Sequence, residues 1–175
     1  GIKIIRAPLI SRGTGKGLRL VLNYLSFAFF ATLTALLLSF KKHDVILVYQ
    51  LSPVTVGIPA ILLKTFRKIP IIFWVQDLWP DSLSATGDIH NSCIIKMVGQ
   101  LVKWIYHHCD LILIQSRAFF PQITRFGIEA SKIIYLPNSA EEIYKPLEVQ
   151  YDCLEAKLMP TGFKIMFAGN IGAAQ

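Results

Sequence analysis

The sequence predicts an α/β fold with an open, doubly wound parallel sheet, and three observations favour it. First, 53% of the 175 residues are hydrophobic and 17% are charged, which excludes disordered, collagen-like and coiled-coil chains. Second, four short apolar runs show no alternation with polar residues, as strands buried on both faces of a parallel sheet require. Third, the segments between these runs are long enough for the right-handed helical crossovers that join parallel strands.

The four apolar runs are the expected strands. They cover residues 45–49, 70–75, 111–114 and 132–136. We expect residues 2–6 to add an earlier strand and residues 163–168 a later one, because both are apolar runs of strand length.

The connecting segments are expected to be helices. They cover residues 54–67, 93–107 and 117–126. Gly127 follows the last of them and is expected to stop it, since glycine adopts the left-handed conformation that ends many helices. The resulting strand–helix–strand succession is typical of a layered α/β domain.

Polar residues stand where each expected strand ends. They are Gln50, Gln76, Asp77, Gln115, Ser116, Asn138 and Ser139. An ordinary change from strand to loop explains any one of them, because loops are polar. Four such positions in register favour a ligand site, since open α/β sheets bind ligands at the carboxyl ends of their strands.

The stretch from Gln76 to Ser82 carries the most chemical information. It follows the strand that looks most central and places Asp77 and Asp81 four residues apart, with Trp79 between them as a possible aromatic platform. A carboxylate at this position can orient a hydroxyl, act as a base or stabilise a developing positive charge. We expect Asp77 to be catalytic, whereas Asp81 either lies in the same cleft or caps the next turn.

Residues 20–40 contain no charged residue over a length that can span a bilayer. Three alternatives are a spanning helix, a wholly buried helix, and a helix packed on the domain with its outer side touching a membrane. Internal polar residues and basic residues at both ends favour the third. Arg12, Lys16 and Arg19 would then meet anionic headgroups, and the net charge of +7 with a pI near 9.4 fits an anionic partner.

Residue spacing excludes several other sites. Residues 11–17 are basic and glycine-rich, but Ile10 and Gly17 stand where a Walker loop needs Gly and Ser or Thr. His107 and His108 are adjacent, which is poor spacing for metal ligands, and histidines suit the last turn of a helix. The three cysteines have no disulfide or zinc spacing, and the basic residues form no stripe with interleaved aromatics, so neither metal nor nucleic acid is expected.

A set of motifs occurs in order between Asp44 and Pro146. It comprises Ile69-Pro70, Gln76-Asp77-Leu78-Trp79-Pro80-Asp81, Asp110-Leu111-Ile112, Gln115-Ser116, Lys132-Ile133, Leu136-Pro137-Asn138-Ser139 and Lys145-Pro146. The set resembles the amino-terminal, acceptor-side domain of glycosyltransferase family 4, the retaining nucleotide-sugar enzymes of the GT-B fold. That resemblance implies a Rossmann-like amino-terminal half over residues 1–160.

The stretch Phe167-Ala168-Gly169-Asn170-Ile171-Gly172 resembles the first strand and glycine loop of the second, nucleotide-sugar-binding domain, whose beginning is expected over residues 161–175. By this resemblance Gly169, Asn170 and Gly172 form the loop at the donor phosphates. Many members carry Arg and Lys in this loop, where the present chain has Asn170 and Gln175. Backbone amides around the glycines would still meet a phosphate.

The subgroup with similar motifs contains bacterial transferases of surface polysaccharide, including fucosamine, O-antigen and capsule sugar transferases. The resemblance implies a hexosyl or amino-sugar transfer from a nucleotide-sugar to a lipid-diphosphate-linked saccharide, at the cytoplasmic face of the inner membrane. Asp77 would be catalytic, and Gln76, Trp79, Asp81, Gln115, Ser116, Asn138 and Ser139 would border the acceptor cleft. No metal or other cofactor is implied, because this fold offsets the leaving diphosphate with helix dipoles and basic side chains.

The resemblance also implies that the chain is a fragment. The family's first strand and glycine loop are expected before Gly1, and its paired-glutamate donor motif after Gln175. We therefore expect the chain alone to be inactive. An alternative from another class is a non-catalytic, membrane-docking acceptor half that needs a separate donor-binding chain.

Overall fold

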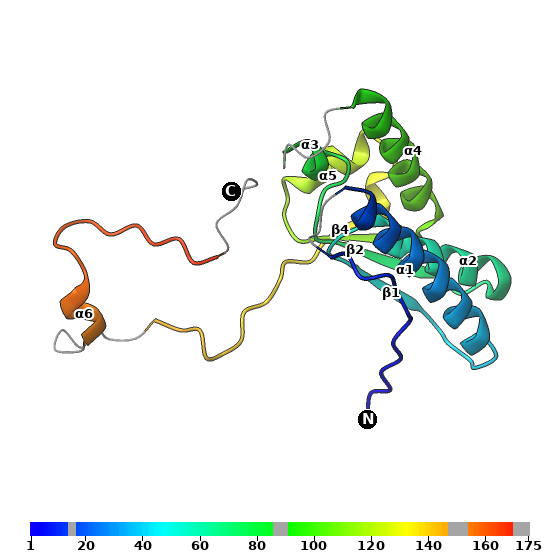
Figure 1. Ribbon diagram of the computed structural model, residues 1–175, viewed down its shortest axis with the longest axis horizontal. Helices are drawn as coiled ribbons and strands as arrows, with labels where there is room; N and C mark the ends of the chain where they lie inside the picture. Colours follow the sequence, from blue (N-terminus) through cyan, green and yellow to red (C-terminus); the bar gives the residue numbers. More distant parts are fainter. Residues whose placement is uncertain (14–16, 86–90, 147–153, 170–175) are drawn as a thin grey trace. The chain divides into compact units, whose positions relative to one another are not determined.

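The structure is a computed structural model of residues 1–175, and it describes residues 1–13, 17–85, 91–146 and 154–169. The chain divides into two compact units, Gly1–Pro137 and Asn138–Gln175 (Figure 1). The first unit contains the sheet and nearly all the helices. In the second unit the short helix α6, Leu154–Leu158, is the helix that the described residues form.

The first unit is built on a parallel sheet of four strands. They are β1 (Ile46–Gln50), β2 (Ile71–Val75), β3 (Leu111–Ile114) and β4 (Ile133–Tyr135). The strands lie in the order β1-β2-β3-β4, so each one pairs with its predecessor in the chain. The predicted α/β class and parallel sheet are confirmed, and each of the four expected strands lies within one residue of its predicted position.

The helices of the first unit are α1 (Gly17–Leu38), the 3₁₀ turn η1 (Val54–Val56), α2 (Gly57–Arg67), α3 (Asp81–Ala85), α4 (Ser92–His108), α5 (Phe119–Thr124) and the 3₁₀ turn η2 (Ala130–Lys132). Four of the helices and one 3₁₀ turn lie in the segments that were expected to be helical, whereas α3 and η2 were not predicted. Asn91 caps α4, because its side-chain oxygen accepts the backbone N–H groups of Cys93 and Ile94. Gly127 has φ +82°, which confirms the predicted stop after α5.

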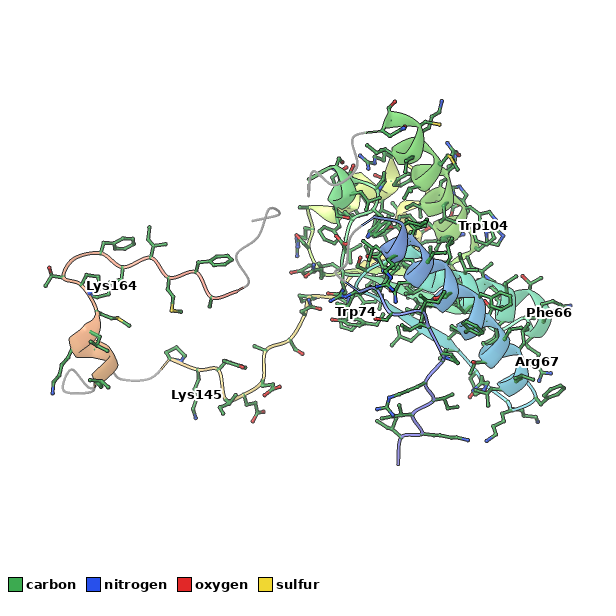
Figure 2. All side chains as sticks on the ribbon, viewed as in Figure 1. Phe66, Arg67, Trp74, Trp104, Lys145 and Lys164 are labelled. Carbon is green, nitrogen blue, oxygen red and sulfur yellow. The ribbon has the colours of Figure 1, made fainter. Side chains whose placement is uncertain are left out.

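The core lies on one face of the sheet. Val48, Phe73, Ile112 and Ile133 are in register across the four strands, and all are buried in one cluster with residues of α2, α4 and α5. On the opposite face Leu47, Tyr49 and Ile134 are each about half exposed. The ring of Trp74, which is labelled in Figure 2, makes an edge contact with the Tyr49 ring at 5.2 Å between centroids. The sequence predicted that helices cover both faces of the sheet. In the described part of the chain, helices cover one face.

Helix α1 packs along α2 (Figure 1). Its Tyr24 reaches the core cluster and makes an edge contact with Trp79, at 6.2 Å between ring centroids. The segment before α1 is tied to the same helix, since Ile10 N–H donates to Ser26 Oγ at 2.9 Å and Asn23 donates to the Ile10 carbonyl.

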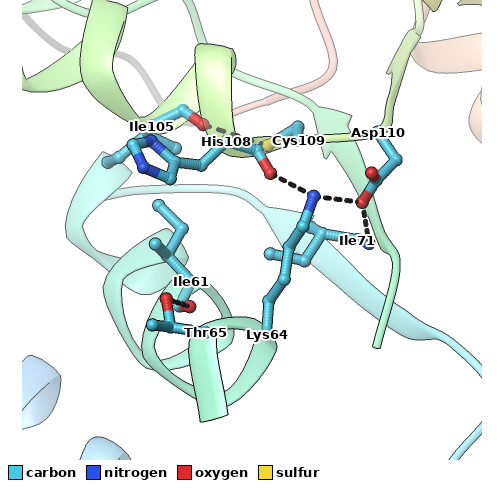
Figure 3. A network of polar contacts seen from close by, with 8 residues as sticks. All are labelled: Ile61, Lys64, Thr65, Ile71, Ile105, His108, Cys109 and Asp110. Carbon is cyan, nitrogen blue, oxygen red and sulfur yellow. Dashed lines mark hydrogen bonds and ion pairs between the residues drawn. The ribbon is translucent and has the colours of Figure 1, made fainter. Parts of the chain in front are cut away.

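A polar clamp closes the amino ends of β2 and β3 (Figure 3). Lys64 Nζ on α2 lies 2.6 Å from Asp110 Oδ2 and 2.9 Å from the carbonyl oxygen of His108. The same Asp110 oxygen accepts the Ile71 N–H at 2.7 Å, and the Asp110 N–H donates back to the Ile71 carbonyl at 3.0 Å. The clamp lies at the edge of the sheet opposite the carboxyl ends, where ligands are expected.

Two expected strands do not form. Residues 2–6 and 163–168 have no strand structure, and Ile2, Phe163 and Ile165 are at least 89% exposed. Apolar character alone does not make a strand, because a strand needs a neighbour for its backbone hydrogen bonds. The division into domains at residue 160 stays a prediction, whereas the two structural units meet at Pro137 and Asn138.

Candidate functional site

Three glutamines stand side by side at the carboxyl edge of the sheet. Gln50 ends β1, Gln76 directly follows β2, and Gln115 directly follows β3. The Gln76 N–H donates to the Gln50 carbonyl at 3.0 Å, and Gln115 Nε2 donates to the Gln76 carbonyl at 3.0 Å. The structure therefore brings Gln50, Gln76 and Gln115 together, as their positions at the ends of the expected strands predicted.

Gln50 is a fully buried amide in this row. Its Nε2 donates to the carbonyl oxygen of Leu51 at 3.3 Å, while its Oε1 has no hydrogen-bond partner in the described part of the chain. A buried acceptor without a donor is costly, and such groups often lie next to functional sites. The sequence identified Gln50 as one of the polar strand ends at the expected ligand edge, whereas the family resemblance did not include it among the cleft residues.

The Asp77 carboxylate is oriented by Trp79, which follows it by two residues in the chain. The indole Nε1–H of Trp79 donates to Asp77 Oδ2 at 3.0 Å. Trp79 is only 7% exposed and belongs to the core cluster, so its ring supports Asp77 and is not an open aromatic platform. The structure thus corrects the prediction that Trp79 is an aromatic platform. Its buried ring instead contributes to the stability of the core.

Asp81 lies in the first turn of α3 and forms an ion pair with Arg125. The two side chains meet at 2.6 Å between Asp81 Oδ2 and Arg125 Nη2, and both are nearly half exposed. The ion pair joins the start of α3, shortly after β2, to the end of α5. It thereby holds these two segments together at the carboxyl edge of the sheet. Arg125 was not a candidate from the sequence, since nothing local relates two residues 44 positions apart.

Tyr106 lies beneath the same loop. Its ring contacts those of Phe73 and Phe126 at 5.9 Å between centroids, and its hydroxyl is buried without a hydrogen-bond partner among the described residues. Burial above all, followed by the nearby Cys109 and Asp77, raises the pKa of Tyr106 far above its ordinary value. The phenol is therefore neutral at physiological pH and adds no charge behind Asp77.

A hollow of about 410 Å³ lies between α5 and β4. It is lined by Ile114, Arg117, Phe120, Pro121, Ile133 and Tyr135. The Arg117 guanidinium lies 5.1 Å from the centroid of the Tyr135 ring. Ser116, a predicted cleft residue, precedes this arginine, and its hydroxyl accepts the Ala118 N–H at 3.3 Å.

The remaining predicted site residues fall elsewhere. Asn138 and Ser139 open the second unit and are exposed, as is Gly169 near its end. Asn170 and Gly172, expected at the donor phosphates, lie outside the described residues, and so does Lys16. Arg12 and Arg19 are both exposed near the start of α1.

The two adjacent histidines make contacts within their own helix. His107 Nδ1 and His108 Nδ1 each lie 2.8 Å from a carbonyl oxygen one turn earlier, those of Lys103 and Trp104. This agrees with the prediction that they belong to the last turn of a helix. Among the described residues, no cluster of three or more His, Cys, Asp or Glu side chains is placed to hold a metal ion.

No protein-family model matches the chain, and no curated protein matches it. The likeness to glycosyltransferase family 4 therefore rests on the sequence motifs. At the carboxyl edge, the candidate site contains one oriented carboxylate, Asp77, beside a row of glutamine amides.

Proposed function

We propose that this chain is the acceptor-side half of a retaining glycosyltransferase. The enzyme would move a hexosyl or amino-sugar unit from a nucleotide-sugar to a lipid-diphosphate-linked saccharide. Surface polysaccharides of bacteria, such as O-antigen and capsule, are assembled from acceptors of this class. The proposal joins the sequence motifs to the arrangement at the carboxyl edge of the sheet.

The observation that carries the proposal is the pairing of Asp77 with Trp79. A buried indole N–H holds one carboxylate oxygen at 3.0 Å and thereby fixes the direction of the other. A carboxylate oriented in this way accepts a hydrogen bond from a sugar hydroxyl and directs its lone pair at an electrophile. Asp77 is the residue that holds the acceptor hydroxyl in this proposal.

The glutamine row supports the same assignment. Carboxamides both donate and accept hydrogen bonds, which suits the hydroxyl groups of a saccharide. Gln76 lies beside Asp77 in the chain, and Gln115 is bonded to the backbone of Gln76. The row therefore offers neutral hydrogen-bonding groups around one charged group, a pattern that fits an uncharged sugar better than an anion.

The remaining parts of the proposal follow from the motifs. Gly169, Asn170 and Gly172 would meet the donor diphosphate, and Asn138 and Ser139 would border the cleft. The reaction needs neither a metal nor another cofactor in this scheme, because helix N-termini and basic side chains offset the leaving diphosphate. The enzyme would work at the cytoplasmic face of the plasma membrane, where its lipid-linked acceptor lies.

Binding of a soluble, short-chain prenyl-diphosphate saccharide to the purified chain tests the acceptor site. The indole N–H of Trp79 serves as the NMR reporter, assigned by comparison with Trp79→Phe. We expect its signal to shift on titration, and we expect Asp77→Asn to weaken binding about tenfold, as loss of one charge-assisted hydrogen bond implies. The control is Asp44→Asn, which removes an exposed carboxylate just before β1 at the other edge.

If Asp77→Asn binds the saccharide with the same affinity as the wild type, Asp77 is not part of the site. If the Trp79 signal shifts equally with the prenyl diphosphate that carries no sugar, the site does not recognise the saccharide. Transfer is tested in cells by replacing Asp77 with Asn in the chromosomal coding sequence and measuring surface polysaccharide. Loss of polymer with Asp77→Asn, but not with Asp44→Asn, supports catalysis. Saccharide binding with unchanged polymer would instead favour the non-catalytic acceptor half.

A further inference from the structure

The net positive charge of the protein comes from the first quarter of its sequence. Residues 1–43 contain seven Lys and Arg residues and no Asp or Glu. The remaining eleven basic residues are balanced by all eleven acidic residues, which begin at Asp44. The whole formal charge of +7 therefore belongs to the segment that contains α1 and its flanks.

The same segment carries a continuous apolar stripe on its surface. Leu18, Leu22, Leu25, Phe29, Leu33 and Leu37 are all between 40% and 75% exposed. They recur every three or four residues along α1, so they share one face of the helix. We call them the α1 stripe. Monomeric proteins rarely leave so long an apolar strip in contact with water.

Charged residues lie at both ends of the stripe. Arg12 and Arg19 are exposed at its beginning, and Lys41 and Lys42 are exposed just beyond its end. A helix that lies in the plane of an anionic membrane presents such cations to the headgroups at both ends, while its apolar side enters the acyl boundary. The combination fits a lipid surface better than a protein groove, because the cations border an otherwise apolar strip.

The other sides of α1 belong to the protein. The helix packs along α2, and Tyr24 reaches the core. Asn23 and Ser26 hold the preceding segment through hydrogen bonds with Ile10. By length and composition α1 also qualifies as a membrane span, with a mean hydropathy of 1.9 over 18 residues. Spanning would separate α1 from α2, since the hydrocarbon core surrounds a lone spanning helix on all sides.

We propose that the α1 stripe is a membrane-docking face that lies flat on an anionic bilayer, with its flanking cations among the headgroups. This names the surface through which the proposed transferase would reach a lipid-linked acceptor. The inference that the α1 stripe binds a membrane is drawn from its exposure and its flanking charges. Only the purpose of this binding depends on the proposed function. Vesicle binding and sugar binding therefore test the two proposals separately.

The test is flotation of the purified 175-residue chain with phosphatidylcholine vesicles, with and without phosphatidylglycerol. We expect binding that requires the anionic lipid and weakens as salt is added. The variant Leu25→Gln/Phe29→Gln should bind about tenfold more weakly or worse, because two inserted apolar side chains are lost. Its matched control, Phe66→Gln/Met97→Gln, changes two side chains that are equally exposed on α2 and α4 and should bind like the wild type.

The charge half of the proposal has its own variant pair. Arg12→Gln/Arg19→Gln should lose the preference for phosphatidylglycerol, whereas Lys96→Gln/Lys103→Gln on the exposed side of α4 should keep it. Circular dichroism and thermal melting confirm that each variant is folded. The proposal would be overturned if a double variant and its control lost vesicle binding equally. It would also be overturned if the wild type bound vesicles of phosphatidylcholine alone as tightly as vesicles that contain phosphatidylglycerol.

Carbonate washing of membranes from expressing cells distinguishes a flat helix from a spanning one. A peripheral domain is released at alkaline pH, and we expect release. Retention in the pellet would overturn the flat orientation. Because the saccharide titration uses a soluble acceptor without vesicles, loss of docking leaves that measurement unchanged.

Discussion

The side chains of Lys64 and Asp110 meet at 2.6 Å between Nζ and Oδ2, 46 positions apart in the sequence. The Asp110 carboxylate oxygen that Lys64 contacts also accepts the Ile71 N–H at 2.7 Å. One carboxylate thus joins α2, the start of β2 and the start of β3. Partial burial raises the pKa of Asp110, but the Lys64 and Ile71 hydrogen bonds together outweigh it, so the net shift is downward.

The clamp predicts a specific pH dependence of stability. A carboxyl group with a lowered folded-state pKa stabilises the protein above its unfolded pKa, near 3.9, and that stabilisation is lost as the pH falls through the folded-state pKa. We expect Asp110→Asn to lower the free energy of unfolding by about 1 kcal/mol at pH 7, a value that allows for solvent screening of the half-exposed pair. Urea unfolding at pH 7 and pH 3 measures this effect.

At pH 3 the difference between Asp110→Asn and the wild type should shrink, because the Asp110 carboxyl of the unfolded wild type, with a pKa near 3.9, is then largely protonated. Asp44→Asn is the control, since Asp44 is an exposed aspartate that makes no ion pair in the described chain. An equal difference between Asp110→Asn and the wild type at both pH values would contradict the assignment of the effect to ionisation.

Gly57 lies where α2 packs closely against α4 and β2. A Cβ at this position would lie 2.8 Å from Ile105 Cγ2 and 3.0 Å from Phe73 Cε2. We expect Gly57→Ala to destabilise the protein by about 1 to 3 kcal/mol through overpacking. The measurement is the free energy of unfolding in urea.

Gly99 provides the matched control for Gly57. It lies inside α4, and a Cβ there would approach Pro80 Cγ at an ordinary 3.8 Å. Gly99→Ala should leave the stability unchanged or raise it by up to about 1 kcal/mol, because alanine favours the helix. Destabilisation of similar size in both variants would contradict the packing between α2, α4 and β2.

Two described cysteines differ in exposure, and we expect them to differ in reactivity. Cys109 is 2% exposed, and burial raises the pKa of its thiol to about 12. Cys93 is exposed at the start of α4. Since the thiolate is the nucleophile, we expect iodoacetamide to modify Cys93 in the folded protein and to modify Cys109 only in denaturant. Peptide mass mapping reads both positions, and rapid labelling of Cys109 without denaturant would show that the core opens locally.

The Trp79 indole is predicted to act as a positioning group for Asp77. Trp79→Phe removes the Nε1–H donor and keeps most of the buried ring. If Asp77 holds the acceptor, this variant should reduce polysaccharide synthesis or saccharide affinity severalfold, as the loss of one hydrogen bond implies. Phe73→Leu, a core change away from the Asp77 carboxylate, controls for general loosening of the fold.

A purely structural role for Trp79 makes a different prediction. In that case Trp79→Phe and Asp77→Asn would reduce saccharide affinity independently, and the double variant would show the sum of both effects. If the indole acts through the carboxylate, the double variant should be no worse than Asp77→Asn alone.

The parts of the fold set by local chemistry were predictable from sequence. Apolar runs identified the strands of the sheet, and Gly127 identified the end of α5 because its left-handed conformation suits glycine. The same signal failed at residues 163–168, since an apolar run does not reveal whether a neighbouring strand is available. Continuous apolar strands likewise predicted two covered faces, whereas Leu47 and Tyr49 are half exposed.

The candidate site was predictable to a similar extent. The rule that ligands meet the carboxyl ends of parallel strands placed Gln76, Asp77 and Gln115 together. The partners of the site residues were not predictable, because they come from distant elements. Arg125 pairs with Asp81 across 44 positions, and the Trp79 ring contacts Tyr24 from α1.

The order of the strands has a consequence for biosynthesis. Because each strand pairs with the one made before it, register partners such as Ile46 and Ile71 leave the ribosome only 25 residues apart. At about 5 to 20 residues per second, β2 emerges about 1 to 5 seconds after β1, which is then already available for pairing. The nascent sheet can therefore grow one strand at a time, with the newest strand always at its free edge.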